Sequence, residues 1–154
     1  MTHHFYEIFH NKILMITLSV WALAQGMKVL LGIARERRFN FRWLIGTGGM
    51  PSSHAAGAAA MATACGLHAG FHSVVFALAA VFALVTMFDA QGVRRSTGQQ
   101  AEVLNRILED IYWRGKIESN KLVELIGHTP IQVLTGAVIG ICLAIILYDM
   151  WVVK

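Results

Sequence analysis

Four apolar stretches divide this chain, and they limit its fold more than any other feature of the sequence. They cover residues 11–34, 53–69, 73–89 and 129–153. A helix needs about 20 apolar residues to cross a bilayer, so the two middle stretches require tilting or local thinning of the bilayer. Hydrophobic residues make up 56% of the 154 residues, more than an ordinary soluble domain contains. We therefore predict an all-α, small integral-membrane helical bundle of about four transmembrane helices, in a single domain over residues 1–154.

The positive charges indicate how this bundle is oriented. Ten of the 13 lysines and arginines lie in residues 35–42 and 94–121. Loops on the cytoplasmic side of a membrane carry the excess of Lys and Arg, so both segments should face the cytoplasm and both chain termini the opposite side. We expect an integral protein of the bacterial inner membrane whose functional site faces the cytoplasm.

The segment after the third apolar stretch has the pattern of an amphipathic helix. Thr97 and Gln100 have the spacing of a helix capping box. Apolar residues then recur at helical spacing, namely Val103, Leu104, Ile107, Leu108 and Ile111. This helix either lies at the cytoplasmic membrane surface or packs on the bundle without contacting lipid, and the sequence alone leaves both alternatives open.

Two histidines stand where the second and the fourth apolar stretches begin. His54 follows Gly-Gly-Met-Pro-Ser-Ser, and His128 lies in Gly-His-Thr-Pro. Helix N-termini present unpaired N–H groups and the positive end of the helix dipole, which together suit phosphate. With the predicted topology, other polar residues reach the same side of the membrane, namely Lys28, Arg35, Ser52, Ser53, Asp89, Arg94 and Arg95.

These residue types fit phosphoryl transfer. Cations and N–H donors stabilise the equatorial oxygens of the transferring group, one neutral histidine can attack phosphorus, and a second can protonate the leaving oxygen. Asp89 or Gln132 can fix the tautomer of the attacking histidine. Each residue taken alone has a simpler explanation, since Lys28 can extend to the interface and Arg94 and Arg95 can contact only lipid head groups. Together they indicate function, because clustered ionisable groups at a membrane are costly.

Three motifs in this order resemble those of the divergent PAP2 family, which is related to type 2 phosphatidic acid phosphatases and vanadium haloperoxidases. The motifs are Gly49-Met50-Pro51-Ser52-Ser53-His54, Asp89-Ala90-Gln91-Gly92-Val93-Arg94-Arg95 and Gly127-His128-Thr129-Pro130. The resemblance covers the chain from about Gln25 to Ile145 and implies a PAP2-like fold. It also implies that His128 is the nucleophile and His54 the general acid. Lys28 and Arg35 match the Lys and Arg of the first motif of the parent superfamily.

The chain departs from the superfamily pattern at four positions: Glu36 replaces a proline, Ser53 a glycine, Leu122 an arginine and Gln132 an aspartate. Without the arginine, Arg94, Arg95 or Lys121 would have to contact the phosphate. An amide can accept a hydrogen bond from imidazole but cannot stabilise an imidazolium as a carboxylate does. Asp89 is therefore an alternative to Gln132 as the orienting group.

We expect an integral-membrane, metal-independent phosphatase that acts on a lipid phosphate monoester or pyrophosphate through a phosphohistidine intermediate. The substrate would be a phospholipid or a polyprenyl phosphate, with no cofactor and no nucleic-acid partner. The alternative is a non-catalytic membrane protein of the same fold that binds or moves a phosphate-bearing lipid; haloperoxidase chemistry is a weaker one. Surrounding cations disfavour a metal site on His54, His128 and Asp89. A homodimer that closes the site is compatible with so thin a bundle.

Overall fold

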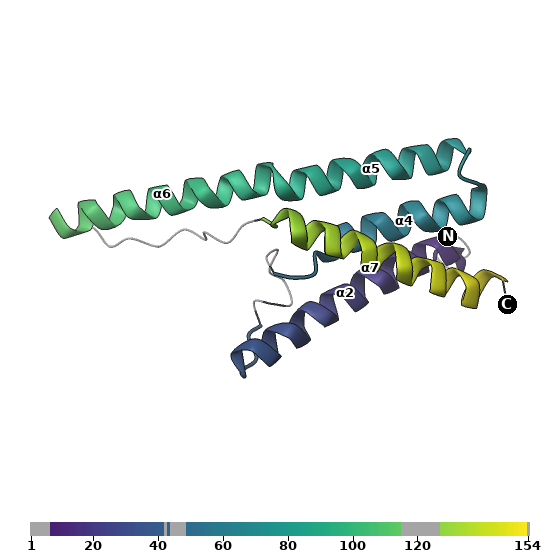
Figure 1. Ribbon diagram of the computed structural model, residues 1–154, viewed down its shortest axis with the longest axis horizontal. Coiled ribbons are helices and arrows are strands. Elements are labelled where there is room, and N and C mark those ends of the chain that lie inside the picture. Colours follow the sequence, from purple (N-terminus) through teal and green to yellow (C-terminus); the bar gives the residue numbers. More distant parts are fainter. Residues whose placement is uncertain (1–6, 42, 44–48, 115–126, 154) are drawn as a thin grey trace.

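The computed structural model describes residues 7–41, 43, 49–114 and 127–153, and the side chains of 93–95 and 109–114 lie outside the description. No strand occurs among the described residues, so the all-α prediction is confirmed. Figure 1 shows the arrangement of the helices. These are α2 (Lys12–Glu36), α4 (Ser53–Ala69), α5 (Val74–Gln91), α6 (Val93–Arg114) and α7 (Pro130–Tyr148), followed by the π-helical turn η1 (Asp149–Val153).

The short helix α4 is the centre of the bundle, in contact with α2, α5 and α7. Its buried side chains are almost all small, and they lie on more than one face: Ala55, Ala56, Ala58, Ala59, Ala60, Ala62 and Ala64. A Cβ added at Gly136 or Gly140 of α7 would collide with the carbonyl oxygen of Ser52 or Ala56. Small residues at such positions let helix backbones approach closely in a membrane. The composition of α4 therefore allows three helices to pack around it.

The ends of the helices follow from local capping. Asn11, Ser52, Ser73 and Thr129 each precede a helix, with a side-chain oxygen that accepts a hydrogen bond from a backbone N–H of the first turn. At the end of α2, Arg37 adopts a left-handed conformation with a φ of 53° and donates its N–H to Ile33. This is a common way for a helix to stop, and it turns the chain back towards α4.

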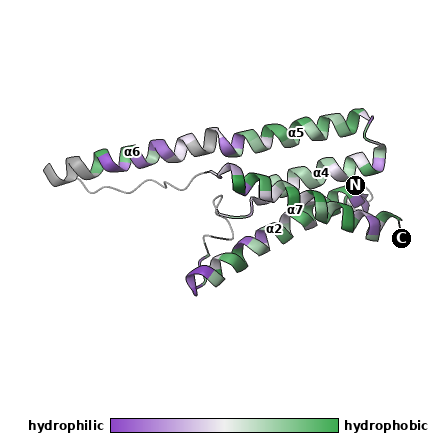
Figure 2. Ribbon diagram, in the orientation of Figure 1, coloured by the Kyte–Doolittle hydropathy of each residue, from purple (hydrophilic) through white to green (hydrophobic). Residues whose placement is uncertain are grey.

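Among the described residues, three helical segments are long and apolar enough to cross a membrane: Lys12–Glu36, Val74–Leu108 and Pro130–Val153. The membrane class is confirmed, but the expected count of about four transmembrane helices is too high by this measure. The difference is α4, which has 17 residues and is enclosed by its neighbours. Figure 2 shows that hydrophobic residues predominate along α5 and α7. Leu78, Phe88 and Leu134 on these helices are exposed, as side chains that face lipid should be.

The amphipathic helix begins earlier than expected. Gly92 donates its N–H to Phe88 and Ser96 donates to Gly92, so helical hydrogen bonding continues across the junction and α6 starts at Val93. Thr97 is therefore inside the helix, and the prediction that it caps the helix is wrong. Figure 1 shows α6 extending α5 in nearly the same direction. Its apolar residues Val103 and Leu104 are 56% and 49% exposed.

Candidate functional site

Three helix ends meet at one end of the bundle, opposite to the N- and C-termini in Figure 1. The backbone N–H of Ser52, before α4, donates to the carbonyl oxygen of Gln132 on α7 at 3.1 Å. The backbone N–H of His128, before α7, donates to the carbonyl oxygen of Ala90 at the end of α5, also at 3.1 Å. These two bonds hold the N-termini of α4 and α7 and the C-terminus of α5 in a fixed relation. The backbones of the three sequence motifs, which contain Ser52, Ala90 and His128, therefore converge at this end of the bundle.

The orientation of His128 depends on Gln132, one turn further along the chain. The Oε1 atom of Gln132 lies 3.2 Å from Nδ1 of His128 and accepts a hydrogen bond from the backbone N–H of Thr129 at 3.0 Å. A backbone N–H can only donate, so the atom between the two must be the amide oxygen. The Nδ1 atom of His128 must then carry the proton, because it meets an acceptor. A neutral imidazole in this tautomer keeps its lone pair on Nε2, which is the atom a nucleophile would use.

Thr129 and Gln132 form a reciprocal capping box at the start of α7. The Thr129 hydroxyl accepts from the N–H of Gln132 at 3.4 Å, while the Gln132 side chain accepts from the N–H of Thr129. Pro130 occupies the first turn, where a missing N–H costs nothing. Gln132 therefore both caps the helix and orients the histidine. The sequence pattern Thr-x-x-Gln is a capping-box signature, so this role of Thr129 could have been predicted from the sequence.

The first turn of α4 provides the second part of the site. Ser52 caps this helix through a 3.3 Å bond from the N–H of Ala55 to its hydroxyl oxygen. Ser52 and Ser53 are both buried, and His54 is half-buried as the second helical residue. Residues at this position stand at the positive end of the helix dipole. An anion held here would be near the beginnings of two helices that the Ser52 and Gln132 backbones connect.

Lys28 of α2 is a buried cation beside the segment that leads into α4. It is 5% exposed and belongs to a helix that is long and apolar enough to span a membrane. A Cβ added at Gly49 would lie 3.2 Å from Cδ of Lys28, so the aliphatic part of the lysine packs on the segment that leads into α4. Gly49 has a φ of 97°, a conformation that only glycine adopts easily. Glycine at position 49 therefore lets the chain turn beside Lys28, a role that the motif by itself does not indicate.

Of the remaining predicted site residues, Arg35 and Asp89 lie near helix ends, and three others lie partly or wholly outside the described residues. Arg35 is exposed in the last turn of α2. Asp89 is half-buried in the last turn of α5, next to the carbonyl group of Ala90 that binds His128. Arg94 and Arg95 belong to the first turn of α6, but their side chains lie outside the described part of the chain, and Lys121 lies entirely outside it.

The described residues contain no group of three or more His, Cys, Asp and Glu side chains arranged to hold a metal ion. Cys65 is half-buried on α4, and Cys142 is exposed on α7. The arrangement instead has the elements of an anion site: a histidine with a fixed tautomer, two helix N-termini and a buried lysine.

Comparison with known proteins identifies the family of this chain. The family model described as the divergent PAP2 family matches residues 9–143. The chain belongs to the divergent PAP2 family. It is also 38% identical over 152 residues to a protein from Bacillus subtilis (strain 168) described as "Uncharacterized membrane protein YuiD", covering 92% of this chain and 96% of the relative. No solved structure matches.

The family assignment confirms the resemblance drawn from the three motifs, and the match covers all of the described site residues. The relative shares nearly the full length of the chain and is named a membrane protein. Together with the three apolar helices, these findings establish an integral membrane protein of PAP2 type.

Proposed function

We propose that this member of the divergent PAP2 family is a metal-independent phosphatase of the membrane, with His128 as nucleophile and His54 as general acid. The observation that carries the proposal is the contact between Gln132 Oε1 and His128 Nδ1 at 3.2 Å. It presents the lone pair of His128 on Nε2. A histidine that served only as a polar membrane-edge residue would need no such fixed tautomer.

The proposed reaction has two steps. His128 Nε2 attacks the phosphorus of a phosphate monoester in line with the ester oxygen, an N–P bond forms and the P–O bond to the alcohol breaks. The protonated His54 gives its proton to the departing oxygen. Water then attacks the phosphohistidine while His54 removes a proton from it, and inorganic phosphate leaves as the N–P bond breaks. Both histidines return to their starting protonation states.

The negative charge of the phosphoryl group would be balanced by protein groups. Lys28 and Arg35 supply cations from α2, and the first turn of α4 at Ser52 and Ser53 supplies N–H groups. We assign the same role to Arg94, Arg95 and Lys121, on the basis of sequence alone. Charge supplied by side chains and helix ends makes a divalent metal unnecessary for this chemistry.

The substrate we propose is a lipid phosphate monoester or pyrophosphate of the cytoplasmic leaflet. The site lies at one end of a bundle whose helices span the membrane, where phospholipid head groups are found. Ten of the 13 Lys and Arg residues stand in the two sequence segments 35–42 and 94–121, which favours a cytoplasmic orientation in the bacterial inner membrane. Phosphatidate, phosphatidylglycerol phosphate and polyprenyl phosphates all have the required chemistry.

One observation favours a second candidate, a protein that binds or moves a phosphate-bearing lipid without hydrolysing it. The group at His128 Nδ1 is the neutral amide of Gln132, which stabilises a developing imidazolium less than a carboxylate would. Asp89 is the carboxylate of the sequence motifs, and we propose it as the alternative group that would orient His128 and stabilise the imidazolium. Hydrolysis remains the leading proposal because binding alone requires no oriented histidine.

The test is phosphate release by the purified protein in detergent, with EDTA present, from a panel of lipid phosphates. We expect release that vanadate inhibits, because vanadate mimics pentacoordinate phosphorus, and that His128→Ala abolishes. His72→Ala is the matched control, since His72 is an exposed histidine at the opposite end of α4. Binding of the lipid phosphates without release from any of them would establish the second candidate.

A further inference from the structure

Trp43 follows α2, which ends at Glu36, yet it lies back against that helix. The side chain of Gln25 donates a hydrogen bond from Nε2 to the carbonyl oxygen of Trp43 at 2.7 Å. A Cβ added at Gly32 would lie 3.0 Å from Cδ2 and from Cε3 of the Trp43 ring. The backbone N–H of Trp43 donates to the carbonyl oxygen of Asn40 at 3.0 Å, which closes a turn. Trp43 is thus held to α2 at two points, by its backbone and by its ring.

These two points lie on the face of α2 that carries Lys28. Gln25, Lys28 and Gly32 follow one another at spacings of three and four residues, so they share one face of the helix. Gln25 and Gly32 are roughly 10 Å apart along the helix axis, and Lys28 lies between them. Gly49 packs on the same lysine, since a Cβ there would lie 3.2 Å from Cδ of Lys28. Trp43 and Gly49, both from the chain between α2 and α4, therefore pack on the same stretch of α2.

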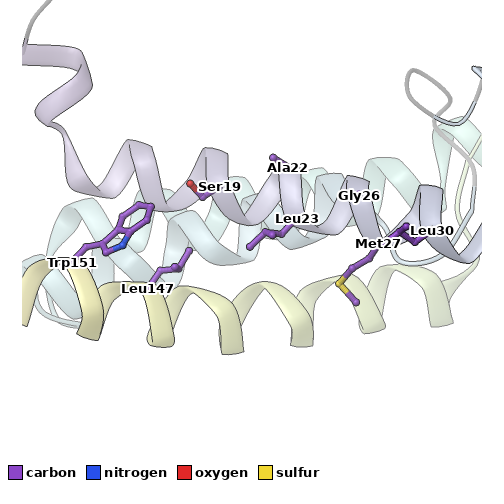
Figure 3. A pocket seen from close by; sticks show the side chains of 8 residues that line it. All are labelled: Ser19, Ala22, Leu23, Gly26, Met27, Leu30, Leu147 and Trp151. Atoms are coloured by element: carbon purple, nitrogen blue, oxygen red, sulfur yellow. The ribbon is translucent and has the colours of Figure 1, made fainter.

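A glycine at position 32 allows the close approach of the indole. An alanine there would place its Cβ 3.0 Å from two ring atoms, whereas carbon atoms normally pack at about 3.5–4.0 Å. Gly26 differs, because it lies on the opposite face of α2 and lines an apolar groove beside α7 (Figure 3). A Cβ at Gly26 would meet no atom within 4 Å. The two glycines of one helix thus form a matched pair, of which only Gly32 bears on Trp43.

The bond from Gln25 adds direction to this packing. Gln25 and Trp43 are both half-buried, and a hydrogen bond shielded from water is stronger than an exposed one. The bond fixes the position of the Trp43 backbone along α2, while the ring contact fixes its side chain one helical turn beyond Lys28. The chain that runs on towards α4 therefore starts from a fixed point beside the lysine.

We propose that Gln25 and Trp43 are positioning residues for Lys28. They hold the chain that precedes α4 against the lysine, and so they fix the separation between its cation and the first turn of α4 at Ser52 and Ser53. This inference rests on the proposed function for the presence of a phosphate between these groups. The attraction between an ammonium and a phosphate falls with distance, and charge-assisted hydrogen bonds depend on geometry. A phosphate is anionic both before and during its transfer, so a displaced lysine should raise Kd and KM more than it lowers kcat.

The test measures the binding of hexylphosphonate to the full-length protein in detergent by isothermal titration calorimetry. Its C–P bond is not hydrolysed, so binding is measured apart from turnover. We expect Trp43→Ala and Gly32→Leu to raise Kd about tenfold, because both remove the ring contact beside the lysine. Gln25→Met removes the donor and should raise Kd about fivefold. Trp43→Phe keeps an aromatic ring, and Gly26→Leu is the matched control, so both should stay within about threefold of the wild type.

A second measurement separates positioning from a purely structural role. If Trp43 acts through Lys28, the two residues are coupled and their effects do not add. In a Lys28→Met background, Trp43→Ala should therefore change the Kd of hexylphosphonate by less than about twofold. With an alkyl phosphate as substrate, Trp43→Ala should raise KM while kcat changes less. Should Trp43→Ala not fold, Gly32→Leu and Gly26→Leu are compared in the same two backgrounds.

The outcomes distinguish this inference from the phosphatase proposal. Equal Kd values for Gly32→Leu and Gly26→Leu overturn the positioning role, as does a full tenfold effect of Trp43→Ala in the Lys28→Met background. A wild type that does not bind hexylphosphonate overturns it as well. The expected pattern of binding, with no phosphate release from any substrate, retains the positioning role and refutes the phosphatase. Phosphate release with unchanged KM and Kd in every variant retains the phosphatase and refutes the positioning role.

Discussion

The hydrogen bond between His128 and Gln132 leads to a quantitative prediction. Replacing Gln132 by methionine keeps the length of the side chain but removes the acceptor that Nδ1 of His128 and the N–H of Thr129 share at 3.2 and 3.0 Å. In the transition state the imidazole becomes positively charged, and a hydrogen bond to a charged group contributes about 1.5–3 kcal/mol. Since about 1.4 kcal/mol corresponds to a tenfold change in rate, we expect kcat to fall roughly 10- to 150-fold in Gln132→Met.

Replacing Gln132 by glutamate, which strengthens the hydrogen-bond acceptor instead of removing it, should preserve or raise kcat. Gln132→Glu keeps the capping box, because glutamate has the same acceptor geometry at this position, and it places a charged acceptor at Nδ1. Charge-assisted hydrogen bonds are roughly twice as strong as neutral ones. We expect kcat for a lipid phosphate to rise by up to about tenfold, measured as phosphate release under saturating substrate.

Thr129→Ala is the control that separates stability from turnover. It removes the hydroxyl that accepts from the N–H of Gln132 and should destabilise the start of α7 by about 1 kcal/mol. The contact between His128 and Gln132 would remain, so we expect kcat within about threefold of the wild type. The reasoning is refuted if Gln132→Met keeps wild-type kcat while folded, or if Thr129→Ala loses as much activity as Gln132→Met.

Three further predictions address packing, charge and orientation. Gly140→Ala forces a methyl group against the α4 backbone and should destabilise the protein by about 1–3 kcal/mol. Gly26→Ala, where the space is open, should be neutral or stabilising. Equal unfolding temperatures of the two variants in detergent would contradict this prediction. Lys28→Met should lower kcat/KM for a lipid phosphate about 10- to 100-fold, because it removes a buried cation next to the anion site, and Lys28→Arg should retain more of the activity; equal kcat/KM for Lys28→Met and wild type would exclude phosphate contact. In a cysteine-free background, an impermeant thiol reagent applied outside intact cells should label a cysteine at His72 but not one at Ser96, and the reverse pattern would show that the site faces outwards.

Much of the site could be predicted from the sequence because its polar residues stand next to apolar stretches. His54 and His128 mark the beginnings of α4 and α7, and any bundle in which these two helices run parallel brings their N-termini to the same end. The capping residues Ser52 and Thr129 act over three residues along the chain, so local sequence is sufficient to predict them. The start of α6 was predicted wrongly because helical hydrogen bonding continues from α5 across Gly92. Thr97 therefore lies inside a helix and does not cap one.

The sequence by itself determined the membrane class, the starts of α2, α4, α5 and α7 and the three motifs, because these depend on composition and on interactions between residues close in the chain. Only the tertiary structure decided that α4 is the centre of the bundle, since its alanines and the facing Gly136 and Gly140 gain their meaning from backbone contact between helices. The contact of Lys28 with the segment at Gly49 likewise depends on how separate parts of the chain pack. Hydropathy indicates how favourably a segment enters the bilayer, but not which of its faces meets protein and which meets lipid.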